Sequence, residues 1–126
     1  MRLRRMIGAV ATVAALLVAV FGFAPAANAT NWTPCNGRHD FVQLWTEYHG
    51  YPACFANQGT YVFGDDPPNT TWSVSDICAG ANQVYYYFYR YQNGSWHPMT
   101  GFLDYWDCYH LRLQYGEVEM SEIDVV

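Results

Sequence analysis

Lysine is absent from the sequence, and besides four histidines the basic side chains are six arginines. Three of these arginines lie within the first five residues, whereas all eleven acidic residues follow Ala29. After Ala29 the chain therefore has three arginines against eleven acids, a formal charge of −8. Nucleic acids and anionic membranes bind clustered Lys and Arg, so neither is expected as a partner. The charge suits solubility and favours a basic partner or a cation.

The sequence also lacks the motifs of common catalytic sites. It contains no H-x-x-x-H or H-E-x-x-H spacing and no G-x-S-x-G turn. The histidines are scattered, at His39, His49, His97 and His110. Two pairs of acids have a spacing that suits an acid and a base, Asp104 with Asp107 and Glu117 with Glu119, but both are expected on solvated turns or edges. We therefore expect no enzyme, no catalytic residue and no obligatory cofactor.

The first 29 residues have the order of parts of a secretory signal peptide. A basic start, Arg2 to Arg5, precedes an apolar run from Ile7 to Phe23, and Ala27-Asn28-Ala29 then provides a small-x-small cleavage pattern. No cluster of stop-transfer charges follows the apolar run. We expect cleavage after Ala29, no membrane span after cleavage, and a secreted, extracellular, monomeric protein with one domain over residues 30–126.

All four cysteines follow the predicted cleavage site, at Cys35, Cys54, Cys78 and Cys108. In an oxidising compartment an even number of cysteines predicts disulfides, here two. Each bridge would contribute roughly 3–4 kcal/mol to the free energy of unfolding. The residues alone leave all three pairings open. Zinc binding is disfavoured, because the sequence has no C-x-x-C pair and no suitably spaced histidine pair.

Helical periodicity is absent as well, and the pattern is that of an all-β sandwich or barrel. β-Branched and aromatic residues alternate with polar ones, and turn residues recur about every ten positions. Residues 30–40 are expected to form an arm that Cys35 tethers. Strands are expected at residues 41–46, 53–56, 60–63, 72–78, 84–91, 95–99 and 119–126, with two short apolar stretches within 102–113. In the strand over 72–78, Trp72, Val74 and Asp76 are expected to face one way.

The expected strand over residues 84–91 is aromatic on both faces. Tyr85, Tyr87, Tyr89 and Tyr91 share one face, and Tyr86, Phe88 and Arg90 share the other. One face must line the core, so the other is exposed or covered by a loop. An exposed row of tyrosines, flanked by Trp96 and Trp106, would form a patch that marks an interaction site and stacks on sugar rings. The sequence does not decide which face is exposed.

Several short motifs resemble one family. Cys54-Phe55-Ala56-Asn57-Gln58-Gly59 resembles the Cys-(Phe/Tyr)-Ala-Asn-Ala-Gly segment of small secreted actinobacterial βγ-crystallin-like proteins, with Gln58 in place of the usual Ala. Further matches are Cys35, the segment Asp40 to Trp45, the Ser-x-Ile-x-x-Gly-x-Asn stretch at Ser75, Ile77, Gly80 and Asn82, and the closing segment Ser121 to Val125.

The resemblance implies a single Greek-key β-sandwich. It favours a Cys35–Cys54 bridge and leaves Cys78–Cys108 as an additional one. The fold class that the resemblance implies includes killer-toxin-like proteins that act on yeasts and fungi, metalloproteinase inhibitors and calcium-binding crystallin domains, and a fold does not choose among such functions.

Calcium binding is one consequence of the resemblance. The family's calcium site resembles (Asn/Asp)-(Asn/Asp)-x-x-(Ser/Thr)-Ser, and residues 65–70 begin in the same way. Asn69 and Thr70 then stand where hydroxyl side chains are expected, and two prolines restrict the backbone carbonyls. If calcium binds, Asp65, Asp66 and Asn69 are its expected ligands and the affinity is weak.

Protease inhibition requires a stiff, convex loop that loses little entropy on docking. Two segments are candidates. Residues 65–71 contain Asp65 and Asp66 followed by the stiff pair Pro67-Pro68, and residues 78–81 adjoin a cysteine. Both segments are also plausible as ordinary connections between strands.

Taken together, these features predict a secreted, non-enzymatic, killer-toxin-like binding protein with antifungal or cytotoxic action. Its expected target is extracellular, either a cell-wall polysaccharide or a secreted protease, and its expected binding residues are Tyr85, Tyr87, Tyr89 and Trp96. The alternatives are an inhibitor of a secreted metalloproteinase and a weak calcium-binding structural module.

Overall fold

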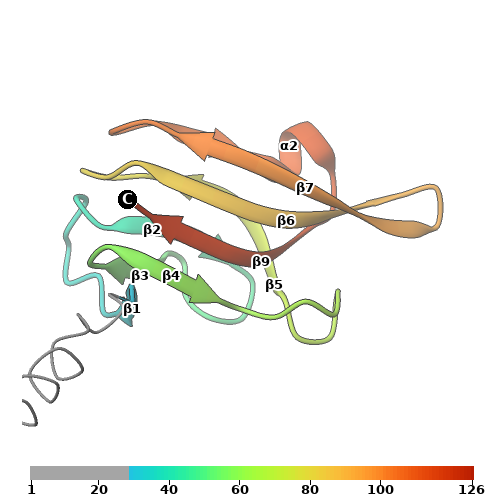
Figure 1. The fold of residues 1–126 in the computed structure, drawn as a ribbon, viewed down its shortest axis with the longest axis horizontal. Helices are drawn as coiled ribbons and strands as arrows, with labels where there is room; N and C mark the ends of the chain where they lie inside the picture. Colours follow the sequence, from blue (N-terminus) through green and yellow to red (C-terminus); the bar gives the residue numbers. More distant parts are fainter. Residues whose placement is uncertain (1–28) are drawn as a thin grey trace, which may run out of the picture.

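The computed structural model describes residues 29–126, so the predicted signal peptide lies, apart from Ala29, outside the described residues. The described part of the chain forms nine strands and one short helix (Figure 1). The strands are β1 (Asn31–Thr33), β2 (Val42–Thr46), β3 (Ala53–Ala56), β4 (Gly59–Val62), β5 (Trp72–Cys78), β6 (Val84–Gln92), β7 (Ser95–Leu103), β8 (Cys108–His110) and β9 (Val118–Val125), and the helix is α2 (Leu111–Tyr115). The predicted all-β class is confirmed. Within residues 29–126 no helix has the length and apolarity needed to cross a membrane.

The strands form two antiparallel layers that share strand β5. Sheet A has the order β1-β3-β2-β5-β8, and sheet B has the order β4-β9-β6-β7. Trp72 and Ser73 at the start of β5 pair with Met120 and Glu119 of β9, whereas the end of β5 pairs with β8. Figure 1 shows sheet B as a broad layer in which β6 lies between β9 and β7. The more specific expectation, a crystallin-type Greek key, stays a prediction.

Most strands lie where the alternating pattern predicted them, and three elements differ. The expected arm contains β1, which pairs with β3 through Trp32 and Phe55. Strand β7 continues to Leu103, four residues beyond its expected end. It tolerates Pro98 because it is the edge strand of sheet B, where a missing N–H donor interrupts no ladder. The short helix α2 was not predicted, because it is a little over one turn long and has no side-chain cap.

The core lies between the two layers and draws apolar side chains from both. Its members from sheet A include Val42, Leu44, Phe55, Val74 and Ile77, and those from sheet B include Val84, Tyr86, Phe88, Met120 and Ile123. Burial raises the pKa of the Tyr86 phenol to about 12, and the neighbouring phenols of Tyr115 and Tyr109 act in the same direction. The ring of Tyr86 is thus a core group, although tyrosine is often found at surfaces.

This core decides which aromatic face of β6 is exposed. Tyr86 and Phe88 are buried, whereas Tyr85, Tyr87 and Tyr91 have 45%, 38% and 46% of their surface exposed. Because side chains alternate along a strand, burying the first pair forces the other tyrosines outward. The exposed face of β6, which the sequence left undecided, is therefore the one that carries tyrosines only.

Two irregular positions adjust the alternation in the central strands. In β5 the register against β2 shifts at Ser75, so Val74 and Ile77 are both buried although they are three residues apart. The expected grouping of Trp72, Val74 and Asp76 on one face is therefore wrong for Asp76, which lies at the surface beyond the shift. In β9 the register against β6 shifts in the same way at Ser121, whose hydroxyl donates to the Tyr87 carbonyl at 2.9 Å.

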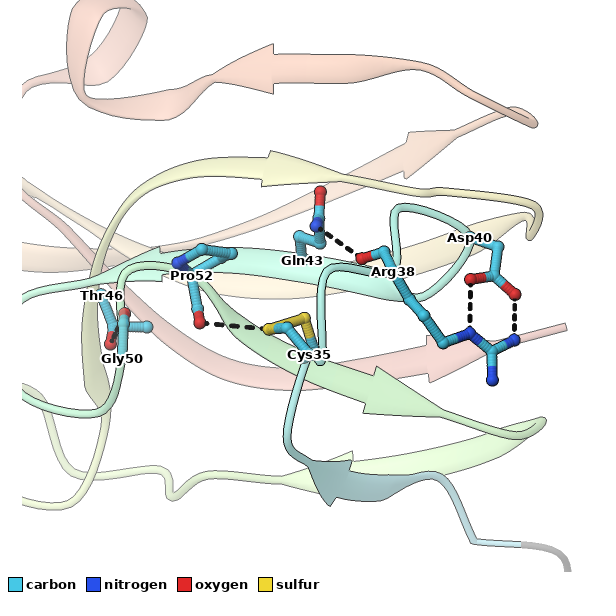
Figure 2. The surroundings of a disulfide bond; sticks show 8 residues. Cys35, Arg38, Asp40, Gln43, Thr46, Gly50 and Pro52 are labelled. Carbon is cyan, nitrogen blue, oxygen red and sulfur yellow. Dashed lines mark hydrogen bonds and ion pairs between the residues drawn. A yellow bond between two sulfur atoms is a disulfide. The ribbon is translucent and has the colours of Figure 1, made fainter.

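Both disulfides have the pairing that the family resemblance favoured, Cys35–Cys54 and Cys78–Cys108. The first bridge ties the arm to β3, and Cys35 Sγ lies 3.4 Å from the Pro52 carbonyl oxygen. Figure 2 shows Cys35 next to Pro52, with the Arg38–Asp40 ion pair further along the arm. The second bridge joins β5 and β8 at directly opposed positions. Two disulfides agree with folding in an oxidising compartment.

The close contact between β6 and β7 gives a stability prediction. Tyr86 lies directly opposite Gly101, and its ring covers the glycine so closely that a Cβ there would overlap it. We expect Gly101→Ala to displace this buried ring and to lower the free energy of unfolding by about 1–3 kcal/mol. Guanidinium denaturation of the oxidised protein measures the change.

The neighbouring exposed substitution Thr100→Ala is the control, and it should change the free energy of unfolding by no more than about 0.5 kcal/mol. Equal stability of Gly101→Ala and the parent protein would contradict this packing arrangement.

Candidate functional site

The outward side of the β6–β7 hairpin carries a continuous set of aromatic side chains. We call this set the aromatic face; it comprises Tyr85, Tyr87, Tyr89 and Tyr91 of β6 with Trp96 and Phe102 of β7. Tyr85 pairs with Phe102 across the strands, with ring centroids 4.8 Å apart, and Tyr91 pairs with Trp96 at 5.1 Å. The predicted binding residues Tyr85, Tyr87, Tyr89 and Trp96 thus share one surface. Trp106, by contrast, lies exposed on the turn between β7 and β8, outside sheet B.

A shallow groove of about 340 Å³ lies at the middle of the aromatic face. Tyr87 and Tyr89 line it together with Pro98 and Thr100 of β7. Val62 of β4, Glu122 of β9 and Asp65 form its other side. The structure therefore brings the predicted aromatic residues and the start of the predicted acidic loop to the same groove, although the two segments are some twenty residues apart in sequence.

Three carboxylates of β9 lie opposite outward tyrosines of β6; Glu119, opposite Tyr89, is buried, and the other two are half-buried. Asp124 lies directly opposite Tyr85, and Glu122 directly opposite Tyr87. Directly opposed side chains on one side of a sheet are about 4.5–5.5 Å apart at Cβ. The Thr60 hydroxyl of β4 donates to Asp124 Oδ1 at 3.2 Å. We call Glu122 and Asp124 the acidic row; it was not predicted, because β9 was expected only to close the sheet.

The acidic loop between β4 and β5 is closed by bonds of its own. The backbone N–H groups of Asn69 and Thr70 donate to the Asp66 carbonyl, at 2.7 and 2.9 Å. The Asn69 side-chain amide donates to Asp66 Oδ2 at 3.2 Å, and the Thr70 hydroxyl accepts the Asp66 N–H at 3.0 Å. Asp65, Asp66 and Pro68 are exposed, and Pro67 is half-buried. Within residues 29–126 no three His, Cys, Asp or Glu side chains gather around a common point suited to a metal. Weak calcium binding at Asp65, Asp66 and Asn69 stays a prediction.

The second candidate inhibitory loop, residues 78–81, is not a free convex loop. Ala79 and Gly80 are buried, and a Cβ at Gly80 would overlap the Asp40 and Phe41 carbonyls. The Asn82 side-chain amide donates to the carbonyls of Asp40 and Ala79, at 3.0 and 3.1 Å. The segment resembling Ser-x-Ile-x-x-Gly-x-Asn thus fastens the end of β5 to the start of β2. This placement agrees with an ordinary connection between strands, the alternative considered for residues 78–81.

The two acid pairs differ in their surroundings. Asp104 and Asp107 lie exposed on the turn after β7, as expected. Glu119, however, is buried, with 5% of its surface exposed, so its expected place on a solvated edge is wrong. Burial raises the pKa of the Glu119 carboxyl. The hydrogen bond from Thr71 Oγ1, at 3.1 Å, opposes that rise, and the negative charge of nearby Glu117 adds to it.

A charged pair on the other layer, Asp76 with His110, was not predicted either. Register between β5 and β8 places Asp76 opposite His110, and the carboxylate and the imidazole Nδ1 form an ion pair. Burial alone would raise the pKa of Asp76, but hydrogen bonds from His110 and Ser75 lower it overall. The pair lines an open groove of about 570 Å³ together with Arg112. The partners are 34 residues apart, and no local motif signals their contact.

A second aromatic cluster lies where β1, β3 and β5 meet. His49 stacks on Trp72 with ring centroids 4.0 Å apart, and Trp32 meets Trp72 edge-on at 4.9 Å. Trp72 is buried, so this cluster extends the core beside the Cys35–Cys54 bridge.

A comparison of the chain with models of known protein families and with curated proteins finds no match.

The buried Glu119 gives a pH-dependent prediction. A raised pKa in the folded protein favours the protonated form, so the carboxylate lowers stability once the pH exceeds that pKa. Glu119→Gln retains an acceptor for Thr71 without the charge. We expect this variant to unfold at a higher denaturant concentration than the parent at pH 7. Denaturation should show the difference vanishing as the pH falls below about 4.3, where the unfolded glutamate is protonated too.

Asp107→Asn, at an exposed residue of the turn after β7, is the control and should have little effect at either pH. A Glu119→Gln variant less stable than the parent at pH 7 would show that the ionised carboxylate is stabilising instead.

Proposed function

We propose that the protein is a secreted, non-enzymatic binding protein whose aromatic face holds a polysaccharide of an extracellular target such as a cell wall. The observation that carries this proposal is the groove at Tyr87 and Tyr89, set in an exposed row of aromatic side chains on a sheet. Sugar rings expose apolar C–H faces that pack on aromatic rings, while their hydroxyls hydrogen-bond to polar groups at the margin.

The arrangement of the aromatic face supports this ligand class. Alternate residues on a strand are separated by about 6.8 Å, so Tyr85, Tyr87 and Tyr89 present rings at intervals of the same order as one sugar unit. β6 is paired on both sides, by β7 and β9, so its backbone is held in place before any ligand arrives. A preformed row of rings loses little conformational entropy on binding.

Exposure of these rings also needs a reason. Tyr85, Tyr91 and Phe102 are each nearly half exposed, although burial of such side chains is favourable. A contiguous exposed apolar patch marks an interaction site more often than single scattered residues do. Together with the resemblance to crystallin-like, killer-toxin-like proteins, this exposed patch favours an antifungal or cytotoxic role for a Greek-key domain.

Inhibition of a secreted metalloproteinase is the second candidate. The observation in its favour is the loop at Asp65 to Thr70, which is exposed, contains two prolines and is braced by bonds between Asp66, Asn69 and Thr70. A braced loop of this kind is suited to docking in a cleft. Stoichiometric loss of protease activity would identify it.

The binding proposal is tested by retention on insoluble wall polysaccharides, β-glucan and chitin. We expect the oxidised protein of residues 30–126 to be retained on at least one of them. The double variant Tyr87→Ala/Tyr89→Ala should bind about five- to 150-fold more weakly, since each ring contributes about 0.5–1.5 kcal/mol. Sedimentation with the solid polysaccharide measures both proteins.

The matched control is Tyr48→Ala/Tyr51→Ala, which removes two tyrosines that are more exposed but lie near the β2–β3 connection. It should be retained like the parent. Equal loss in both double variants would mean non-specific adsorption, and no retention of the parent would remove the polysaccharide proposal and favour the protease experiment.

A further inference from the structure

We propose that the aromatic face is selective for a cationic amino-sugar polymer, in which free ammonium groups meet the acidic row while the sugar rings lie on the tyrosines. This inference rests on the proposed polysaccharide binding and names the class of polysaccharide. The observation behind it is that carboxylates of β9 stand directly opposite tyrosines of β6. Asp124 stands opposite Tyr85, and Glu122 stands opposite Tyr87.

The outward side of sheet B carries negative charge at the place where a ligand would lie. Glu122 and Asp65 both line the groove, and Asp124 stands next to it on β9. The two ion pairs among residues 29–126 are Arg38–Asp40 and His110–Asp76. Glu122 and Asp124 therefore have no cation of the described chain to neutralise them.

The arginines of the described residues are all engaged elsewhere. Arg38 pairs with Asp40 in the arm, and Arg112 donates to Ser73 Oγ at 3.2 Å. Arg90 alternates with the tyrosines of β6, so it points to the opposite side of the sheet, where its guanidinium lies 5.6 Å from the centre of the Tyr115 ring. Ser73 lies directly opposite Glu119, which stands opposite Tyr89, so Arg112 lies near that end of the sheet. No ion pair joins a described arginine to Glu122 or Asp124, and the charge that complements the acidic row is therefore expected from the ligand.

A neutral sugar would leave this negative charge uncompensated. Docking a polymer on Tyr87 removes water from the adjacent Glu122, and desolvating a carboxylate is unfavourable unless a cation or several donors replace the water. An ammonium group on the sugar ring supplies both a charge and three donors at that position. It also gains from the faces of the neighbouring tyrosine rings, which attract cations. The ring and the carboxylate therefore act together on the same sugar unit.

A basic peptide would satisfy the charge but fits the surface less well. Extended peptides commonly bind by adding a strand to a free sheet edge. The β7 edge of sheet B is interrupted by Pro98, which has no N–H to donate. The tyrosines and carboxylates instead lie on the broad side of the sheet, which suits a flat chain of rings.

The test compares retention on cross-linked, insoluble chitosan, a polymer of glucosamine, with retention on its N-acetylated counterpart chitin and on β-glucan. We expect chitosan to bind the parent protein at least tenfold more tightly than chitin at low salt. The preference should fall steeply in about 1 M salt, where the screening length is only about 3 Å.

The double variant Glu122→Gln/Asp124→Asn should lose this preference and bind chitosan and chitin alike. The matched control Glu47→Gln/Asp107→Asn removes the same two charges at exposed positions outside sheet B and should keep the preference. If both double variants lose it equally, net charge and not the acidic row is responsible, and the inference is overturned.

Three other outcomes are equally decisive. Equal retention of the parent on chitin and chitosan overturns the charge inference and leaves polysaccharide binding in place. Absence of retention on all three polymers overturns both proposals. Binding of polylysine that outcompetes chitosan for the same residues overturns the choice of a sugar polymer, since it shows a general site for cationic chains.

Discussion

The pairing of β6 with β7 on one side and β9 on the other is the constraint on which the rest of the structure depends. It places Tyr86 and Phe88 in the core and leaves no freedom for the strand to rotate. Because alternate side chains point to opposite sides, the remaining tyrosines must then face outward. An aromatic surface is thus a direct consequence of core packing, and its geometry is as rigid as the sheet that carries it.

The surface chemistry follows from how β9 meets β6. Their register sets Asp124 beside Tyr85 and Glu122 beside Tyr87. The shift at Ser121 keeps Met120 and Ile123 both in the core, and without it one of them would face solvent. The carbonyl of Ser121 also accepts the N–H groups of Phe63 and Gly64, which carry the chain into the acidic loop. One irregular residue therefore links the core, the acidic row and the loop.

The sequence predicted the strands well and their surroundings less well, for physical reasons. Side chains alternate between the two faces of a strand, and this alternation is a local property. The order of residues 84–91 alone therefore shows which side chains share a face. Which face is buried depends on partners distant in sequence, and aromatic residues on both faces gave no contrast between them. The burial of Glu119, the Asp76–His110 pair and the enclosure of Gly80 all depend on strand register, which short motifs do not encode.

The most direct test of the account is to map the contact surface by NMR, titrating the oxidised protein of residues 30–126 with a soluble glucosamine oligomer. The account predicts that shift changes concentrate on the outward residues of β6 and β9, at Tyr85, Tyr87, Glu122 and Asp124, and leave Tyr48 and Tyr51 unchanged. Changes centred on the Asp76–His110 groove, with the aromatic face silent, would contradict it.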